Sequence, residues 1–290
     1  MKITVSTYSY GGYAQREDFG IFACIDNAIE SGADAIEVVE GTFAGSDSPE
    51  IADQVKAYCE KKGIVVSSCC FGADFLNGSD GDLSAEITKA KKMIDLTERY
   101  GAKIARFDVS RGYDNGKKHS IGYQNALPRL VEAARSLADY GMNKGILICT
   151  ENHGQFSEDS ERIEQLINAV AHDNYGALVD IGNFLCVDED PIKAVGRLAP
   201  YAVHVHAKDF HIKSGMERFP GTGWWYTRGG NYFRGAIIGH GDARAEQSLA
   251  ILKRAGYDGF ISIEFEGLED NLLGIRECIH NVRLFWDEAK

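Results

Sequence analysis

The sequence lacks the features that mark several large classes of protein. It has only five prolines among 290 residues and no segment rich in proline and glycine that would separate two domains. No apolar run approaches the roughly 20 residues that span a bilayer, and the first residues, MKITVSTYSYGGY, lack the apolar stretch of a signal peptide. These absences predict one globular domain over residues 1–290 that makes no contact with a membrane.

Positive charge is also scarce. Lysine and arginine number 31 against 43 aspartate and glutamate residues, which gives a formal net charge of -12. An acidic surface repels phosphate backbones, so the composition argues against nucleic acid as a partner. No G-x-G-x-x-G pattern follows a predicted strand, and a dinucleotide-binding site is therefore not expected.

Cysteine is present but in a pattern that does not suit a disulfide framework. The seven cysteines are odd in number and show no CxxC spacing. We expect buried thiols in a reducing compartment, which predicts a cytoplasmic protein.

The sequence does contain one pattern repeated eight times, a predicted strand followed by a predicted helix. Short runs rich in β-branched residues predict strands at 2–8, 35–40, 64–70, 103–109, 145–151, 176–182, 202–208 and 260–266. Amphipathic segments between them predict helices near 21–32, 50–62, 84–100, 123–142, 157–171, 190–198, 245–255 and 268–288. Eight strand–helix units predict an α/β protein with a parallel sheet closed into a (β/α)8 TIM barrel. A doubly wound open sheet is the alternative.

Two of the connections from a predicted strand to the next predicted helix are unusually long. Residues 110–122 follow the fourth predicted strand, and residues 211–242 follow the seventh. Long loops after the strands of a barrel lie at its carboxyl-terminal face, where active sites are found.

Polar residues end four consecutive predicted strands. They are Glu151, Asp180, His206 and Glu264. Three carboxylates and one imidazole would form a hard, mostly oxygen shell that suits Mn²⁺, Mg²⁺ or Co²⁺. The alternative is that each residue is simply a polar strand end facing water, but four such positions on neighbouring strands favour one divalent metal ion.

Three further side chains should point to the same side of the sheet as these four residues, because they stand two positions away along the chain from one of them. His204 lies one pleat deeper than His206, and it either supports a ligand or is a hydrogen-bonded interior histidine. His153 is a candidate for proton transfer beside the metal, or it only hydrogen-bonds a ligand. Lys208 would either stabilise a developing oxyanion or neutralise Asp209.

These residues give the chain a resemblance to a known family. The segments TENHG, DIGN, HVHAKDF and, above all, residues 239–267 resemble the sugar phosphate isomerase/epimerase superfamily, the xylose-isomerase-like TIM barrels. The resemblance implies a metal held by the four strand-end residues, with Glu151 and Glu264 flanking the reacting carbons of a sugar. Ketose 3-epimerases of this superfamily carry a histidine three residues after the ligand aspartate, whereas this chain has Asn183.

The connection after the seventh predicted strand contains the sequence PGTGWWYTRGGNYFRG. Its expected substrate-binding residues are Trp224, Trp225, Arg228 and Arg234, because aromatic and guanidinium groups suit a sugar face or a flat aromatic group. The insertion resembles the catalytic subunits of bacterial C-glycoside deglycosidases, which implies a small β-rich partner subunit. The alternative is an ordered structural loop over the barrel mouth.

Three functional hypotheses follow. The first is a metal-dependent enzyme that removes a proton next to a sugar carbonyl, of the keto-sugar isomerase or epimerase type, with Glu151, Glu264 and His153 as catalytic residues. The second is a C-glycoside deglycosidase subunit that cleaves a 3-keto C-glucoside by elimination. The third is a non-catalytic barrel that binds a sugar or supports an assembly, and in each case we expect an oligomer.

Overall fold

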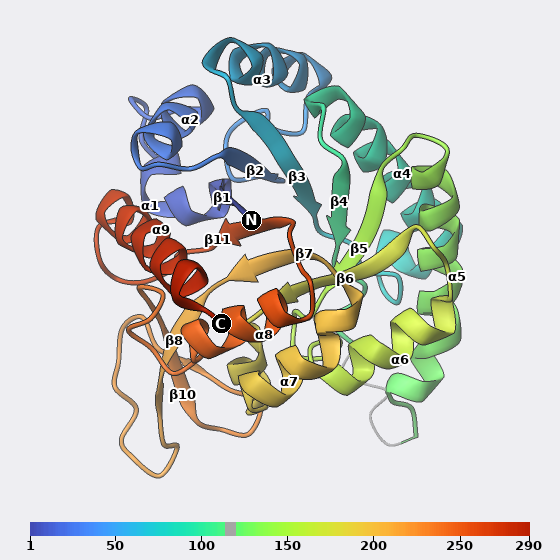
Figure 1. The fold of residues 1–290 in the computed structure, drawn as a ribbon. Coiled ribbons are helices and arrows are strands. Elements are labelled where there is room, and N and C mark those ends of the chain that lie inside the picture. The colour runs from blue at the N-terminus through green and yellow to red at the C-terminus, as the bar shows by residue number, and fades with distance from the viewer. Residues whose placement is uncertain (114–119) are drawn as a thin grey trace.

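The computed structural model describes residues 1–113 and 120–290 and contains a closed barrel of eight parallel strands surrounded by helices (Figure 1). Residues 114–119 of the predicted connection 110–122 lie outside this description. Around the barrel the strands follow the order β1-β11-β7-β6-β5-β4-β3-β2. Their bounds are β1 Lys2–Ser6, β2 Ala35–Val39, β3 Val65–Phe71, β4 Ile104–Phe107, β5 Leu147–Glu151, β6 Tyr175–Asp180, β7 Ala202–Ala207 and β11 Phe260–Ile263. The fold is therefore the predicted α/β TIM barrel, and the open-sheet alternative is wrong.

The helices between the strands form the outer layer. They are α1 Gly11–Ala14, α2 Ile21–Glu30, α3 Pro49–Lys62, α4 Leu83–Tyr100, α5 Tyr123–Met142, α6 Ser160–Val170, α7 Pro191–Leu198, α8 Ala245–Arg254 and α9 Asn271–Glu288. Helix ends carry their sequence signals. For example, Ser48 and Asp82 accept hydrogen bonds at the starts of α3 and α4, and Gly63 and Gly101 end them in the left-handed conformation.

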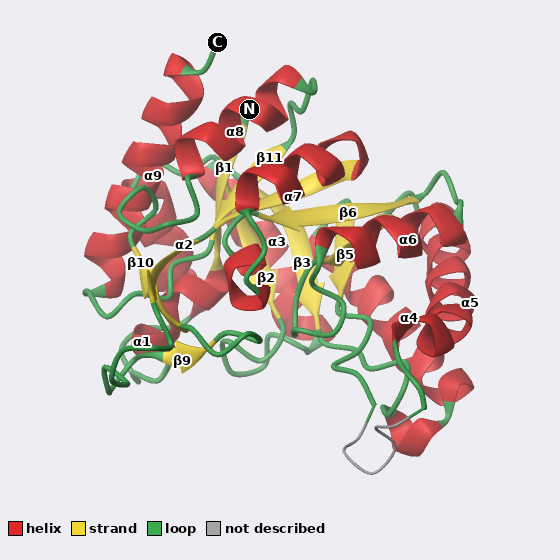
Figure 2. Ribbon diagram, turned by 90° about the horizontal axis from the view of Figure 1, so that it is seen from below, coloured by secondary structure: helices red, strands yellow, loops and turns green. Residues whose placement is uncertain are grey.

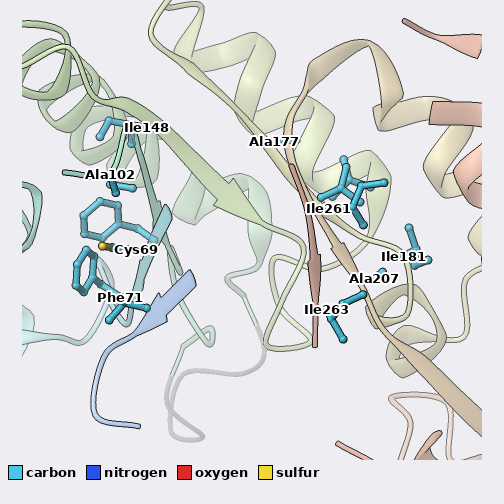
Figure 3. Packing of buried hydrophobic residues seen from close by; sticks show 14 of the residues in the cluster. Cys69, Phe71, Ala102, Ile148, Ala177, Ile181, Ala207, Ile261 and Ile263 are labelled. Atoms are coloured by element: carbon cyan, nitrogen blue, oxygen red, sulfur yellow. The ribbon is translucent and has the colours of Figure 1, made fainter. Parts of the chain in front are cut away.

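Side-chain alternation separates the hydrophobic core beneath the helices from the barrel interior, which holds both polar residues and a small separate cluster of Cys70, Cys149 and Leu178. In β11, Ile261 and Ile263 point outward into the core beneath the helices, and Figure 3 shows them near Ala207 of β7. The residues between them, such as Ser262, face the barrel interior, where Ser262 bonds to Glu37 of β2. Because successive strand residues face opposite sides, every outward apolar residue leaves its neighbour facing the axis.

The connection 211–242 differs from the predicted loop because it contains a small antiparallel sheet. Its strands are β8 Asp209–Lys213, β9 Trp225–Tyr226 and β10 Tyr232–Ala236, in the order β8-β10-β9. Glycines in TRGGN allow the tight reversal between β9 and β10, and Gly230 has a φ of 92°. Figure 2 shows β9 and β10 beside the loops that follow the barrel strands.

All seven cysteines are buried and free, as expected from their odd number and spacing. Within residues 1–113 and 120–290, no helix combines the length and apolar character needed to cross a bilayer.

Candidate functional site

Four buried polar side chains converge at the carboxyl-terminal end of the barrel. Glu151 ends β5, Asp180 ends β6, His206 lies in β7, and Glu264 directly follows β11. These four strands are neighbours in the barrel. Each residue contributes one potential ligand atom, and the four atoms lie within 4.8 Å of one another. The sequence-predicted set is thus brought together in one place.

The Nδ1 atom of His206 is the common neighbour of the three carboxylates. It lies 3.2 Å from Oε1 of Glu151, 3.4 Å from Oε1 of Glu264 and 3.9 Å from Oδ2 of Asp180. All four side chains are at most 9% exposed. This nitrogen, and not Nε2, therefore belongs to the candidate ligand set.

The electrostatics of this cluster fit a bound cation. Burial raises the pKa of Asp180 to about 6, with Glu151 and Glu264 adding to the rise against the opposing effect of Lys208. The Oδ2 atom of Asp180 is buried and accepts no hydrogen bond from the described residues, although Nζ of Lys208 lies 3.2 Å away. A site for a hard divalent metal ion has these two features: a buried oxygen that is still free to bind an ion, and several carboxylates close together.

Two buried cations partly balance the carboxylates. Nζ of Lys208 lies 2.7 Å from Oε2 of Glu264, and Arg106 of β4 pairs with Glu151 and Asp108. Burial alone would raise the pKa of Glu264, but His206 and Lys208 lower it to about 2. Lys208 therefore faces the site.

The alternative role of Lys208, neutralising Asp209, is not what the structure shows. The carboxylate of Asp209 instead accepts backbone N–H groups of Gly239, Gly241 and Ala243.

His153 lies beside the cluster and is held by a carboxylate. Its Nδ1 is 3.0 Å from Oδ1 of Asp108, and Nη2 of Arg106 lies 2.8 Å from the same oxygen. Burial lowers the pKa of His153, but the hydrogen bond and negative charge of Asp108, together with the charge of Glu151, outweigh it and the net pKa is raised. Because Nδ1 is engaged, Nε2 is the ring nitrogen positioned for exchange of a proton.

A cavity of about 640 Å³ opens beside the cluster, within the range of about 300–1,000 Å³ typical of small-molecule sites. The residues of the cluster and its surroundings that line it are Arg106, Asp108, Glu151, His153, Lys208 and Glu264. Charged groups include Glu158, Glu266 and Arg111, and aromatic walls come from Phe71, Trp225 and Phe233. The cavity thus combines a polar floor with an apolar side, an arrangement suited to a polyhydroxylated molecule with one apolar face or group.

The predicted substrate-binding residues divide into two groups. Lys208 and Trp225 line the cavity, whereas Trp224, Arg228 and Arg234 are not among its described lining residues. The guanidinium of Arg228 pairs with Asp159 and donates to the backbone carbonyl of Gln155. Arg234 lies over the ring of Trp224, 5.7 Å from its centroid. The structure thus places Lys208 and Trp225 at the cavity and the other three outside its described lining, and contact of any of the five with substrate stays a prediction.

Some site residues were missed in the sequence. Arg106 and Asp108 stand on either side of Phe107, which packs in the outer core, so both should face the barrel interior as His206 does. In the same way, Glu37 stands between Ile36 and Val38 of the core. These could have been found by applying the alternation to strands two and four.

Two others carried no such signal. Glu158 and Asn183 lie on connections, and only the folded chain brings them to the site: Asn183 donates to Oε1 of Glu151, and Glu158 lines the cavity.

Comparison with known proteins gives a family match. The family described as xylose isomerase-like TIM barrel matches residues 25–281 of this chain. A curated relative, the rhizopine catabolism protein MocC of Rhizobium meliloti, is 23% identical over 243 residues, which cover 78% of this chain and 70% of MocC.

Solved structures with similar folds share little sequence with this chain. The IOLI protein with a bound zinc atom has a TM-score of 0.75 at 19% identity and covers 100% of this chain and 99% of its own. A xylose isomerase-like TIM barrel protein from Mycobacterium smegmatis in complex with magnesium has a TM-score of 0.74 at 16% identity, with coverages of 100% and 98%. D-psicose 3-epimerase in the presence of D-fructose has a TM-score of 0.71 at 14% identity, with coverages of 99% and 99%.

Proposed function

The chain belongs to the xylose isomerase-like TIM barrel family, and from that premise we propose that it is a divalent-metal-dependent enzyme that removes a proton next to a sugar carbonyl. The observation that carries the proposal is the convergence of ligand atoms of Glu151, Asp180, His206 and Glu264 to within 4.8 Å of one another, with Glu151 and Glu264 lining the cavity. The structural relatives with a sugar epimerase activity in their name support the substrate class.

The four converging residues would hold the ion. Bound there, a divalent cation would polarise a sugar carbonyl and stabilise negative charge developing on oxygen. Three oxygen ligands and one nitrogen suit Mn²⁺, Mg²⁺ or Co²⁺, and we propose Mn²⁺. Relatives containing magnesium or zinc are consistent with a divalent ion of some kind.

The chain's own residues would supply proton transfer and orientation. Glu151 and Glu264 lie 3.2 and 3.4 Å from Nδ1 of His206 and both line the cavity, and they are the proposed acid–base pair for passing a proton between carbons or faces of a sugar. His153, oriented by Asp108 at 3.0 Å, is the proposed third proton-transfer group. The ammonium of Lys208 would hydrogen-bond a substrate oxygen at the same end of the cavity.

The test of this function is proton exchange. The purified protein, loaded with Mn²⁺ and incubated with a panel of ketoses in deuterated water, should incorporate deuterium at a carbon next to the carbonyl, detected by mass spectrometry. Glu264→Gln should abolish incorporation. Incorporation that is absent for every ketose, or unaffected by this substitution, would contradict the proposal.

A second candidate is favoured by the aromatic side of the cavity. Trp225 is 49% exposed and lines the cavity together with Phe233, which suits a flat apolar aglycone. A C-glycoside deglycosidase would use the same deprotonation beside a 3-keto group; a C=C bond would form in the sugar as the C–C bond to the aglycone breaks, and the aglycone carbon would take up a proton from the acid–base group. Release of the aglycone from a 3-keto aryl C-glucoside would select this reaction over isomerisation.

Four expectations from the sequence stay predictions. They are the cytoplasmic location, an oligomeric state, the small β-rich partner that the resemblance to C-glycoside deglycosidases implies, and the single domain over 1–290. The non-catalytic hypothesis of a sugar-binding or assembly scaffold has no need of four converging ligands, so the metal content also separates it from the enzyme.

A further inference from the structure

The barrel interior beneath the candidate metal site contains a carboxylate that the proposed chemistry does not use. Glu37 lies in β2, across the barrel from β7, and is fully buried. A charge at this depth is costly unless it is fully hydrogen-bonded, so its partners show why it is retained.

Four donors from three other strands surround the Glu37 carboxylate. Ser68 of β3 donates at 2.7 Å, Ser262 of β11 at 2.9 Å and Nε2 of His204 lies at 2.9 Å. The fourth is Nε2 of His206, which lies 3.1 Å from Oε1 and 3.2 Å from Oε2. The carboxylate therefore has little freedom to rotate or shift, because each oxygen is engaged from a different direction.

This contact decides how the imidazole of His206 can be used. An ionised carboxylate only accepts hydrogen bonds, so Nε2 of His206 must carry a proton toward Glu37. The opposite nitrogen, Nδ1, is the one surrounded by Glu151, Asp180 and Glu264. A histidine that binds a metal through one nitrogen commonly donates its other N–H to a carboxylate, which fixes the tautomer and raises ligand basicity.

We infer that Glu37 is a positioning residue that holds the Nε2–H form of His206, so that Nδ1 is presented as the metal ligand. The inference rests on the proposed function, since it assumes that the four-residue cluster binds a metal. His204 acts one step further away by donating to the same carboxylate. From the sequence, His204 is either a support for a metal ligand or a hydrogen-bonded interior histidine. This inference gives it the supporting role.

A competing assignment uses the same residues. Glu37, Cys70 and His206 also place potential ligand atoms within 4.8 Å of one another, so they could hold a second ion. That ion would compete with Ser68, Ser262 and His204 for the carboxylate and would remove the proton from Nε2. The four hydrogen bonds of Glu37 favour the positioning role, and the number of ions bound per chain separates the two assignments.

The first measurement needs no variant. Protein labelled with ¹⁵N-histidine is loaded with Zn²⁺, a diamagnetic probe, and the His206 ring is assigned through its loss in His206→Gln. The expected spectrum has a proton on Nε2 and none on Nδ1. A proton on Nδ1, or none on either nitrogen, would overturn the inference.

The second measurement compares Mn²⁺ affinity by competition with a chelator. Glu37→Gln should weaken binding by about tenfold, the lower end of the usual 10–100-fold effect of such partners, with one ion per chain in the wild type. The matched control is Glu86→Gln, which also alters a buried glutamate, one that bonds to Ser79 away from the barrel axis and should leave affinity unchanged.

The outcomes distinguish the two proposals. A wild type that binds no ion defeats the proposed function and this inference with it. Equal affinity in the wild type and Glu37→Gln defeats only the role of Glu37. Two ions per chain, one of them lost in Glu37→Gln, would make Glu37 a ligand and overturn the positioning role.

Discussion

Glu158 shows how burial at the cavity edge changes the chemistry of a single residue. It is 2% exposed, accepts the backbone N–H of Gln155 and lines the cavity. Desolvation raises its pKa from 4.5 to about 7, against the smaller opposing effect of His153. A carboxyl group that titrates near neutral pH inside the cavity makes both stability and substrate binding sensitive to pH.

Replacing Glu158 should make the free energy of unfolding less dependent on pH. Between its unfolded pKa of 4.5 and its folded pKa of about 7, the folded protein holds a proton that the unfolded chain has lost. The free energy of unfolding therefore falls as pH rises through this window, by on the order of 3 kcal/mol. In urea titrations at pH 5 and pH 8, Glu158→Gln should lose less stability between the two pH values than the wild type does. An identical pH dependence in the two proteins would contradict the assignment.

His153 provides a second test at this scale because it lies beside the ligand set without belonging to it. His153→Gln should keep the wild-type Mn²⁺ content but lower proton exchange by about 10²–10⁴-fold, the usual contribution of a general acid or base. Metal content by elemental analysis and deuterium incorporation are measured on the same sample. Full exchange activity in the variant would leave the glutamates as the only proton-transfer groups.

At the scale of elements, alternation along the strands accounts for what the sequence could predict. Ile261 and Ile263 face the core, so Ser262 and Glu264 face the axis, and the same parity places His204 and His206 inside. The eight strands and the four converging residues were therefore predictable.

The small sheet in residues 211–242 was not predictable. The pairing of Phe233 with both Ile212 and Trp225 depends on tertiary contacts and not on any local period. For the same reason the sequence could not tell that Trp225 faces the cavity while Trp224 lies against Arg234.

This difference between adjacent tryptophans gives a matched pair of variants. Trp225→Ala should weaken binding of a substrate with an apolar group about tenfold, about 1.4 kcal/mol, because it removes an aromatic wall of the cavity. Trp224→Ala removes a tryptophan side chain one residue earlier, and this variant should bind the same substrate with wild-type affinity. Calorimetric titration with an aryl glucoside measures both, and equal losses in the two variants would place the aromatic contact elsewhere.

At the scale of the whole molecule, the proposed ion links the barrel strands and should stabilise the fold. Its ligands come from β5, β6, β7 and the end of β11, which are half of the closed sheet. A ligand that binds only the folded state at 100 times its Kd adds about 2.7 kcal/mol to the free energy of unfolding.

For a chain of this length, that free energy corresponds to a rise of Tm by about 5 °C. A thermal scan with and without Mn²⁺ should show this increase, and Asp180→Asn should lose most of it. An unchanged Tm in the wild type at saturating Mn²⁺ would argue against a site that joins four strands.

The most direct test of the central claim is the metal content of the purified chain after dialysis against Mn²⁺ and removal of free ion. The wild type should retain one ion per chain, and Glu264→Gln should retain less than about a tenth of that amount, because one of four converging ligands is weakened. A wild-type protein that retains no ion, or a variant that retains as much as the wild type, would contradict the account.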